Sequence, residues 1–199
     1  RRGGFFLLFL PVSENLGQSH DNGGRMYTVL VKTQVAEQES GTFTIDRGRY
    51  LEYTAKEIST QLRVLSRDAI ECFKSWPCLL MQEGRSDETA RIGRVTNISQ
   101  MAESIQLVIE PVALRELLVN DTLWKMRDEL DLQQFEFSRH HMAVKDRNLF
   151  DVLARLGQGV DTAATVGFKN KPLPAPSRAQ LVACVNRIAE WSHTDLDQF

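Results

Sequence analysis

The sequence predicts an α+β fold: an antiparallel sheet covered by helices, followed by a linker and a short C-terminal helical segment. Two kinds of apolar periodicity predict it, since short runs rich in β-branched residues alternate with longer stripes at helical spacing. The third observation is that the strands expected between residues 78 and 109 are joined by short connections, which favour antiparallel neighbours.

The composition is that of an ordinary globular chain. Of its 199 residues, 42% are hydrophobic and 25% are charged, and the net charge of −2 gives no global attraction to nucleic acid or to an anionic membrane. Cys72, Cys78 and Cys184 lack the Cys-x-x-Cys spacing of a zinc ribbon and form an odd set, which argues against a disulfide framework. We therefore expect a cytoplasmic protein with no cofactor, no metal site and no membrane contact.

The first 25 residues differ from the rest. Their apolar run, residues 5–12, is far shorter than the roughly 20 residues that span a bilayer. Met26 directly precedes the first convincing strand pattern. We predict that residues 1–25 are a disordered arm or a non-native leader.

The main α+β domain is expected over residues 26–156 and opens with strands at 27–35 and 42–45. Thr54 and Glu57 then have the spacing of a capping box, which predicts one helix running to Phe73. Pro77 ends that helix, because proline cannot donate the next helical hydrogen bond.

Three further strands are expected at residues 78–82, 90–98 and 104–109. Gly93, inside the second of them, indicates a β-bulge. Arg91 and Arg94 alternate with apolar residues in the same strand, which predicts one solvated face and one buried face.

Helical patterning returns after Pro111, over residues 114–118 and 122–130, with Trp124 as a packing anchor. Phe135 and Phe137 alternate with polar residues and predict a short strand. A last helix of this domain is expected over residues 146–156, with Asp146 at its N-terminus and Gly157 at its C-cap.

The predicted linker covers residues 157–176, because this stretch is too long and too poor in apolar periodicity for a loop within a compact domain. Residues 177–199 form the expected helical segment. It begins with a second capping box at Ser177 and Gln180 and carries an apolar stripe through Leu181. We interpret this segment as the start of a further module.

The segment 135–150, F-E-F-S-R-H-H-M-A-V-K-D-R-N-L-F, holds most of the candidate site residues. From His141 it has the spacing of a protein-kinase catalytic loop, but Ala143 stands where the catalytic aspartate belongs, which excludes that chemistry. Adjacent histidines project in different directions and rarely ligate one metal ion together. We predict instead a charged interaction surface made of Arg139, His140, His141, Lys145, Asp146 and Arg147.

This string, with W-P-C-L-L-M-Q-E-G and A-R-I-G-R-V-T-N-I upstream, resembles uncharacterised bacterial domains associated with effectors of antiphage conflict systems. The tail P-S-R-A-Q-L-V-A-C-V-N-R-I-A-E-W is similar to helical modules of abortive-infection proteins. The resemblance implies a sensing or adaptor role, with a protein partner or an adjoining effector domain.

The expected function is therefore a non-enzymatic sensing or adaptor module that binds protein in a bacterial defence-type protein. One alternative is a hydrolase or nuclease, which would bring together Glu83, Asp87, His140 and His141. A second alternative is nucleic-acid binding, with Phe168 available for stacking and basic contacts from Arg91, Arg94, Lys169 and Lys171.

Overall fold

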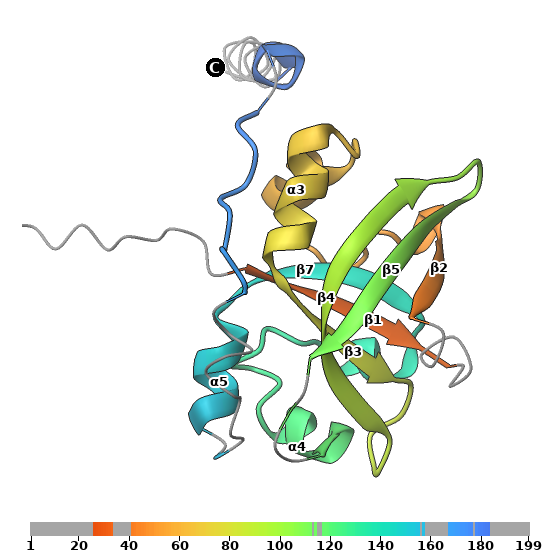
Figure 1. Ribbon diagram of the computed structural model, residues 1–199, viewed down its shortest axis with the longest axis vertical. Coiled ribbons are helices and arrows are strands. Elements are labelled where there is room, and N and C mark those ends of the chain that lie inside the picture. The colour runs from red at the N-terminus through yellow and green to blue at the C-terminus, as the bar shows by residue number, and fades with distance from the viewer. Residues whose placement is uncertain are drawn as a thin grey trace, which may run out of the picture.

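The computed structural model describes residues 26–33, 41–112, 114, 117–155, 157, 167–176 and 178–183 (Figure 1). It confirms the α+β class, because one strongly twisted sheet is flanked by short helices (Figure 1). The predicted arm at residues 1–25 and most of the C-terminal helical segment lie outside the described residues. Within that segment, residues 178–183 are helical, as expected.

In the described part of the chain, seven strands form one sheet. They are β1 (Met26–Lys32), β2 (Thr42–Asp46), β3 (Pro77–Gln82), β4 (Thr89–Gln100), β5 (Ser104–Val112), β6 (Leu118–Val119) and β7 (His141–Asp146). Their order is β2-β5-β4-β3-β1-β7, with β6 beside β4. The sheet is mixed rather than wholly antiparallel, because β1 and β3 run parallel and the chain between them crosses over through helices.

The sheet curls until its two edges approach each other. Tyr50, just after β2, forms a parallel bridge with Met142 in β7, the strand at the opposite end of the sheet. The result is a nearly closed barrel. Closure explains why β7 is buried at its first five positions although it ends the strand order.

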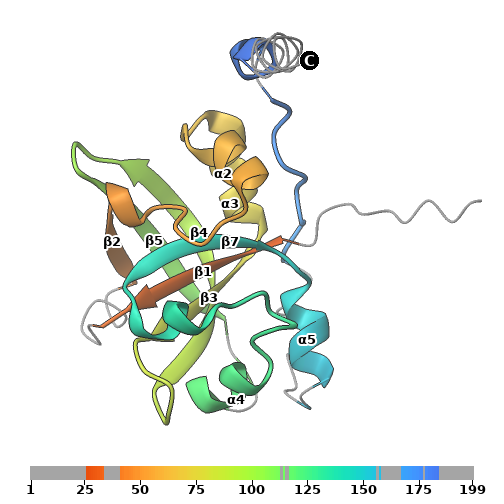
Figure 2. The ribbon, with the colours of Figure 1, turned by 180° about the vertical axis from the view of Figure 1, so that it is seen from behind.

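Six short helices pack on this barrel: η1 (Arg47–Arg49), α2 (Lys56–Leu62), α3 (Arg67–Ser75), α4 (Asn120–Lys125), η2 (Gln134–Ser138) and α5 (Leu149–Arg155). Figure 2 shows α2 and α3 on one side of β1 and β7, and α4 and α5 on the other. Two apolar cores result. One lies inside the barrel beneath α2 and α3, and the other lies between the outer face of β1, β3 and β7 and the helices α4, η2 and α5.

The helix predicted from Thr54 to Phe73 is broken into α2 and α3, so that expectation was wrong. Ser66 caps α3 by accepting a hydrogen bond from the Ala69 amide at 3.2 Å. The predicted capping box does not form, because the Thr54 hydroxyl accepts from the Val144 amide of β7 at 2.9 Å instead. A tertiary contact thus replaces the local cap.

Three other local expectations were also wrong. Phe135 and Phe137 lie in the 3-10 helix η2 rather than in a strand. Leu118, expected at the end of a helix, begins β6. Asp146 ends β7 instead of starting the next helix, which begins at Leu149.

Gly93 allows close packing and does not form the predicted bulge, since the register shift in β4 lies between Val95 and Asn97. A Cβ atom at Gly93 would collide with the side chain of Ile109 and would lie 2.9 Å from Leu80 Cδ1. Glycine is therefore required by the approach of neighbouring side chains.

We expect Gly93→Ala to lower the free energy of unfolding by about 1–3 kcal/mol, because the added methyl group overpacks the barrel interior. Gly48→Ala is the matched control, since nothing lies within 4 Å of a Cβ atom there, and it should change stability by less than about 0.5 kcal/mol. Urea denaturation measures both. Equal stability of the two variants would contradict this packing.

Candidate functional site

One cluster of three ionisable groups in the described residues is buried. Lys145 Nζ lies 2.7 Å from Glu136 Oε1, and His141 Nε2 lies 3.0 Å from Glu136 Oε2. The side chains of Glu136 and His141 are fully buried, and that of Lys145 is 2% exposed. We call these three residues the buried charge network.

The network follows from local structure on two elements. His141 and Lys145 are four residues apart in β7, so they project from the same face of the strand. Glu136 lies at the third position of η2, where its Oε1 also accepts the Gln133 amide at 2.8 Å. A capping interaction therefore aims the carboxylate at β7.

In the described part of the chain, the network bonds to groups inside the fold. Lys145 Nζ also donates to the carbonyl oxygen of Tyr53 at 2.9 Å, and the Tyr53 ring packs edge-on against His141 with centroids 5.0 Å apart. His141 Nδ1 lies 2.6 Å from the carbonyl oxygen of Arg139. Because a carbonyl only accepts, Nδ1 is the donor of this hydrogen bond, and Nε2 faces the Glu136 carboxylate.

A second polar side chain beside the network is equally enclosed. The hydroxyl of Tyr27 donates to the carbonyl oxygen of Leu130 at 2.6 Å. Burial raises the pKa of Tyr27 well above its usual value, and the nearby Glu136 carboxylate raises it further. The phenol therefore stays neutral and structural.

The predicted interaction surface of residues 139–147 is thus divided. His141 and Lys145 are buried and cannot contact a partner, so this part of the expectation is corrected. The reason is that both faces of β7 are covered, so the side chains of His141 and Lys145 lie in the buried charge network. Arg139, Asp146 and Arg147 are exposed, and Arg139 pairs with Glu52 at 2.9 Å.

The residues of the hydrolase alternative have separate surroundings. Glu83 accepts from the Thr33 hydroxyl at 2.9 Å, and Asp87 is exposed in the turn between β3 and β4. His140 is half-buried, whereas His141 is enclosed with Glu136. Among the described residues there is no group of three histidine, cysteine or carboxylate side chains able to hold a metal ion.

The basic residues proposed for nucleic-acid binding are partly engaged elsewhere. Arg94 Nη1 donates to the carbonyl oxygen of Gly167 at 2.6 Å, and its guanidinium lies 4.5 Å from the centroid of the Phe168 ring. Phe168 is 9% exposed and also contacts Phe150. Its ring is therefore covered and not presented for base stacking, while Arg91, Lys169 and Lys171 are exposed.

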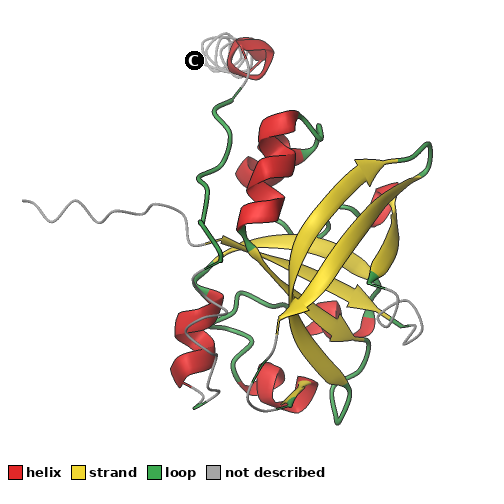
Figure 3. Ribbon diagram, in the orientation of Figure 1, coloured by secondary structure: helices red, strands yellow, loops and turns green. Residues whose placement is uncertain are grey.

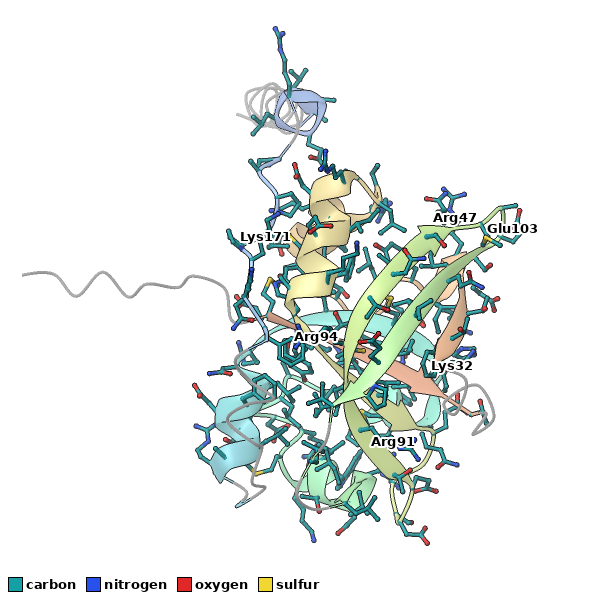
Figure 4. All side chains as sticks on the ribbon, viewed as in Figure 1. Lys32, Arg47, Arg91, Arg94, Glu103 and Lys171 are labelled. Atoms are coloured by element: carbon teal, nitrogen blue, oxygen red, sulfur yellow. The ribbon has the colours of Figure 1, made fainter. Side chains whose placement is uncertain are left out.

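Residues 167–176, expected to be part of a linker, lie against the domain, and we call them the docked segment. This segment has no helix or strand and runs beside α3 (Figure 3). Figure 4 shows Lys171 next to α3 and Arg94 near the foot of the segment. The surface that receives it, which we call the docking face, is formed by Cys72, Ser75, Trp76 and Arg94.

The docking face binds mainly the backbone of this segment. Trp76 Nε1 donates to the carbonyl oxygen of Lys171 at 2.7 Å, and Cys72 Sγ donates to that of Pro172 at 3.1 Å. The Ser75 hydroxyl accepts the Lys171 amide at 3.0 Å. Leu173 adds an apolar anchor, because it packs against the core beneath α3.

Sequence patterns identified few of the residues that form the buried charge network and the docking face. Glu136 is one of many charged residues, and its burial depends on the distant strand β7. The alternation Pro172, Pro174, Pro176 was a usable signal, because alternating prolines favour an extended backbone able to lie along a surface. The partner of that segment, Trp76, could not be identified from spacing alone.

The two described cysteines are buried, and burial raises the pKa of both thiols. Neither is therefore poised as a nucleophile. Within the described ranges, no helix is both long enough and apolar enough to cross a bilayer.

Comparisons of the chain with protein-family models, with curated proteins and with solved structures find no match.

We expect Lys145→Met to reduce the free energy of unfolding by about 3–5 kcal/mol, because it leaves the Glu136 carboxylate buried without its ammonium partner. Lys125→Met is the matched control. It removes a comparably short ion pair, 2.7 Å to Asp121, whose side chains are 69% and 52% exposed, and should change stability by at most about 1 kcal/mol.

Chemical denaturation monitored by tryptophan fluorescence compares the two variants. Adding Glu136→Gln to Lys145→Met should recover part of the loss, because the unpaired buried charge is then removed. A loss of the same small size in both single variants would contradict an internal role for Lys145.

Proposed function

We propose that this chain is a non-enzymatic sensing or adaptor module that recognises an extended, proline-containing peptide segment on its docking face. The observation that carries the proposal is that the docking face already holds such a segment, residues 167–176, through hydrogen bonds to its backbone. The docked segment, which belongs to the same chain, therefore occupies the position that we propose for the ligand.

The contacts have the chemistry of peptide recognition. A groove that bonds mainly to backbone groups accepts different side chains at exposed positions, and here Lys169 and Lys171 are exposed. Proline limits the conformations of the free segment, which reduces the entropy lost on docking. Leu173 supplies selectivity because it is the one side chain of the Pro-Leu-Pro stretch packed against the core.

The buried charge network favours binding over catalysis. A general acid or base must reach its substrate within hydrogen-bonding distance, whereas Glu136 and His141 are fully buried and bonded to one another. The network therefore has a structural role inside the fold.

The biological setting of the proposal comes from the resemblance of Trp76–Gly84, Ala90–Ile98 and residues 135–150 to effector-associated bacterial domains. On that basis we propose a bacterial defence-type protein as the setting. The partner would be a separate protein or an adjoining effector domain that presents an extended segment with proline on both sides of an apolar residue.

The native cysteines provide the test. In a chain carrying Cys184→Ser, the pair of changes Phe168→Ala and Leu173→Ala should release the docked segment while leaving the docking face intact. Cys72, which Pro172 covers, should then alkylate at least about tenfold faster, because two buried apolar anchors are lost. Cys78, inside the barrel, should keep its rate.

A synthetic peptide with the wild-type sequence of residues 167–176, added at millimolar concentration to this variant, should slow the alkylation of Cys72 again. Lys169→Ala is the matched control and should leave both rates unchanged, since this side chain is exposed. Mass spectrometry of the labelled cysteines gives the rates. Failure of the peptide to protect Cys72, or equal acceleration of both cysteines, would contradict the proposal.

A further inference from the structure

A hollow of about 370 Å³ lies at one end of the barrel. Its walls come from η1, the turn that follows η1, α2 with the residue after it, the end of β4 and the start of β5. We call it the mouth hollow. Its volume is at the lower end of the range of small-molecule sites, roughly 300–1,000 Å³.

The charges on its walls have one sign. Arg47 and Arg63 line it, and none of its lining residues is an aspartate or glutamate. Among the described residues, the charged side chains of the wall are thus two guanidinium groups, one from η1 and one from the residue that follows α2. Guanidinium groups bind phosphate and carboxylate through paired, charge-assisted hydrogen bonds.

Other arginines of the same region are used differently. Arg49 and Arg139 both pair with Glu52, at 3.0 and 2.9 Å. In the described part of the chain, the guanidinium groups of Arg47 and Arg63 make no such ion pair. They therefore keep their hydrogen-bonding capacity for a ligand.

Apolar side chains also line the mouth hollow. Ile105 is buried, and the half-buried Tyr50 donates a hydrogen bond from its hydroxyl to the carbonyl oxygen of Leu62 at 2.9 Å. Ser59 and Gln100 add a hydroxyl and an amide to the wall. A lining with both guanidinium groups and apolar side chains suits a molecule that has an anionic group and an apolar body.

We propose that the mouth hollow binds a small organic phosphate, with the phosphate facing Arg47 and Arg63 and the apolar body over Tyr50 and Ile105. The site is independent of the proposed peptide recognition, because it shares no residue with the docking face. It would make the module responsive to a mononucleotide-sized ligand.

The test is a titration of the ¹⁵N-labelled full chain with adenosine 5′-monophosphate, inorganic phosphate and adenosine, followed by NMR. The monophosphate should shift the amide signals of Gly48, Ser59 and Gln100 at a lower concentration than phosphate does. Adenosine should bind more weakly than either, and the affinity for the monophosphate should fall as salt is added.

Arg47→Gln with Arg63→Gln should weaken binding of the monophosphate at least about tenfold, because charge-assisted hydrogen bonds are lost. Arg67→Gln is the matched control, an exposed arginine on α3 that does not line the mouth hollow. Gly48→Leu is a second variant that should weaken binding of the monophosphate. Open space surrounds this position, so the new side chain can occupy the mouth hollow without a clash.

Three outcomes would overturn the proposal. One is the absence of shifts at these amides with both the monophosphate and phosphate. The second is equal binding by the double arginine variant and by Arg67→Gln. The third is tighter binding of adenosine than of the monophosphate. The cysteine-labelling result for the docking face is unaffected by any of them, so the two proposals fail separately.

Discussion

The turn at residues 50–54 closes the barrel, and hydrogen bonds from β7 hold it. Leu51 and Tyr53 have φ angles of 63° and 58°, a left-handed conformation that costs about 1–2 kcal/mol for each bulky residue. Two hydrogen bonds from β7 offset this cost: the Val144 amide donates to Thr54 Oγ1, and Lys145 Nζ donates to the carbonyl oxygen of Tyr53. Lys145 in turn is held by Glu136.

The contact between β7 and the 50–54 turn explains why charged residues occupy a strand that is buried on both faces. It also means that the surfaces proposed for recognition lie on other elements. His141 and Lys145, which the sequence offered as candidate site residues, are instead bonded to Glu136 inside the fold. The two surfaces that we propose for ligands lie around α2 and α3. The docking face uses Trp76 and its neighbours at the end of α3, and the mouth hollow uses Arg63 after α2.

The first five strands were predictable because they depend on local patterns, whereas β7 was not predicted and β6 and η2 were expected as a helix and a strand. The β-branched run of β1 and the stop at Pro77 needed no tertiary information. Pairings between distant segments were not predictable: the parallel contact of β1 with β3, the bridge from Tyr50 to Met142, and the capture of the Thr54 hydroxyl by β7. The docking of residues 167–176 was not predictable either, because it depends on hydrogen bonds to backbone groups, which sequence patterns do not reveal.

Native-state hydrogen exchange, resolved for each amide, tests the account most directly. It distinguishes the amides of the barrel from those of the docked segment, because amides opened by local release exchange faster than those opened only by global unfolding. We predict that the Val144 amide exchanges only through global unfolding, whereas the amides of Asn170 and Lys171 exchange faster, through release from Ser75. Exchange of the Val144 amide at the rate of the Lys171 amide would contradict the account, because β7 would then be a mobile surface.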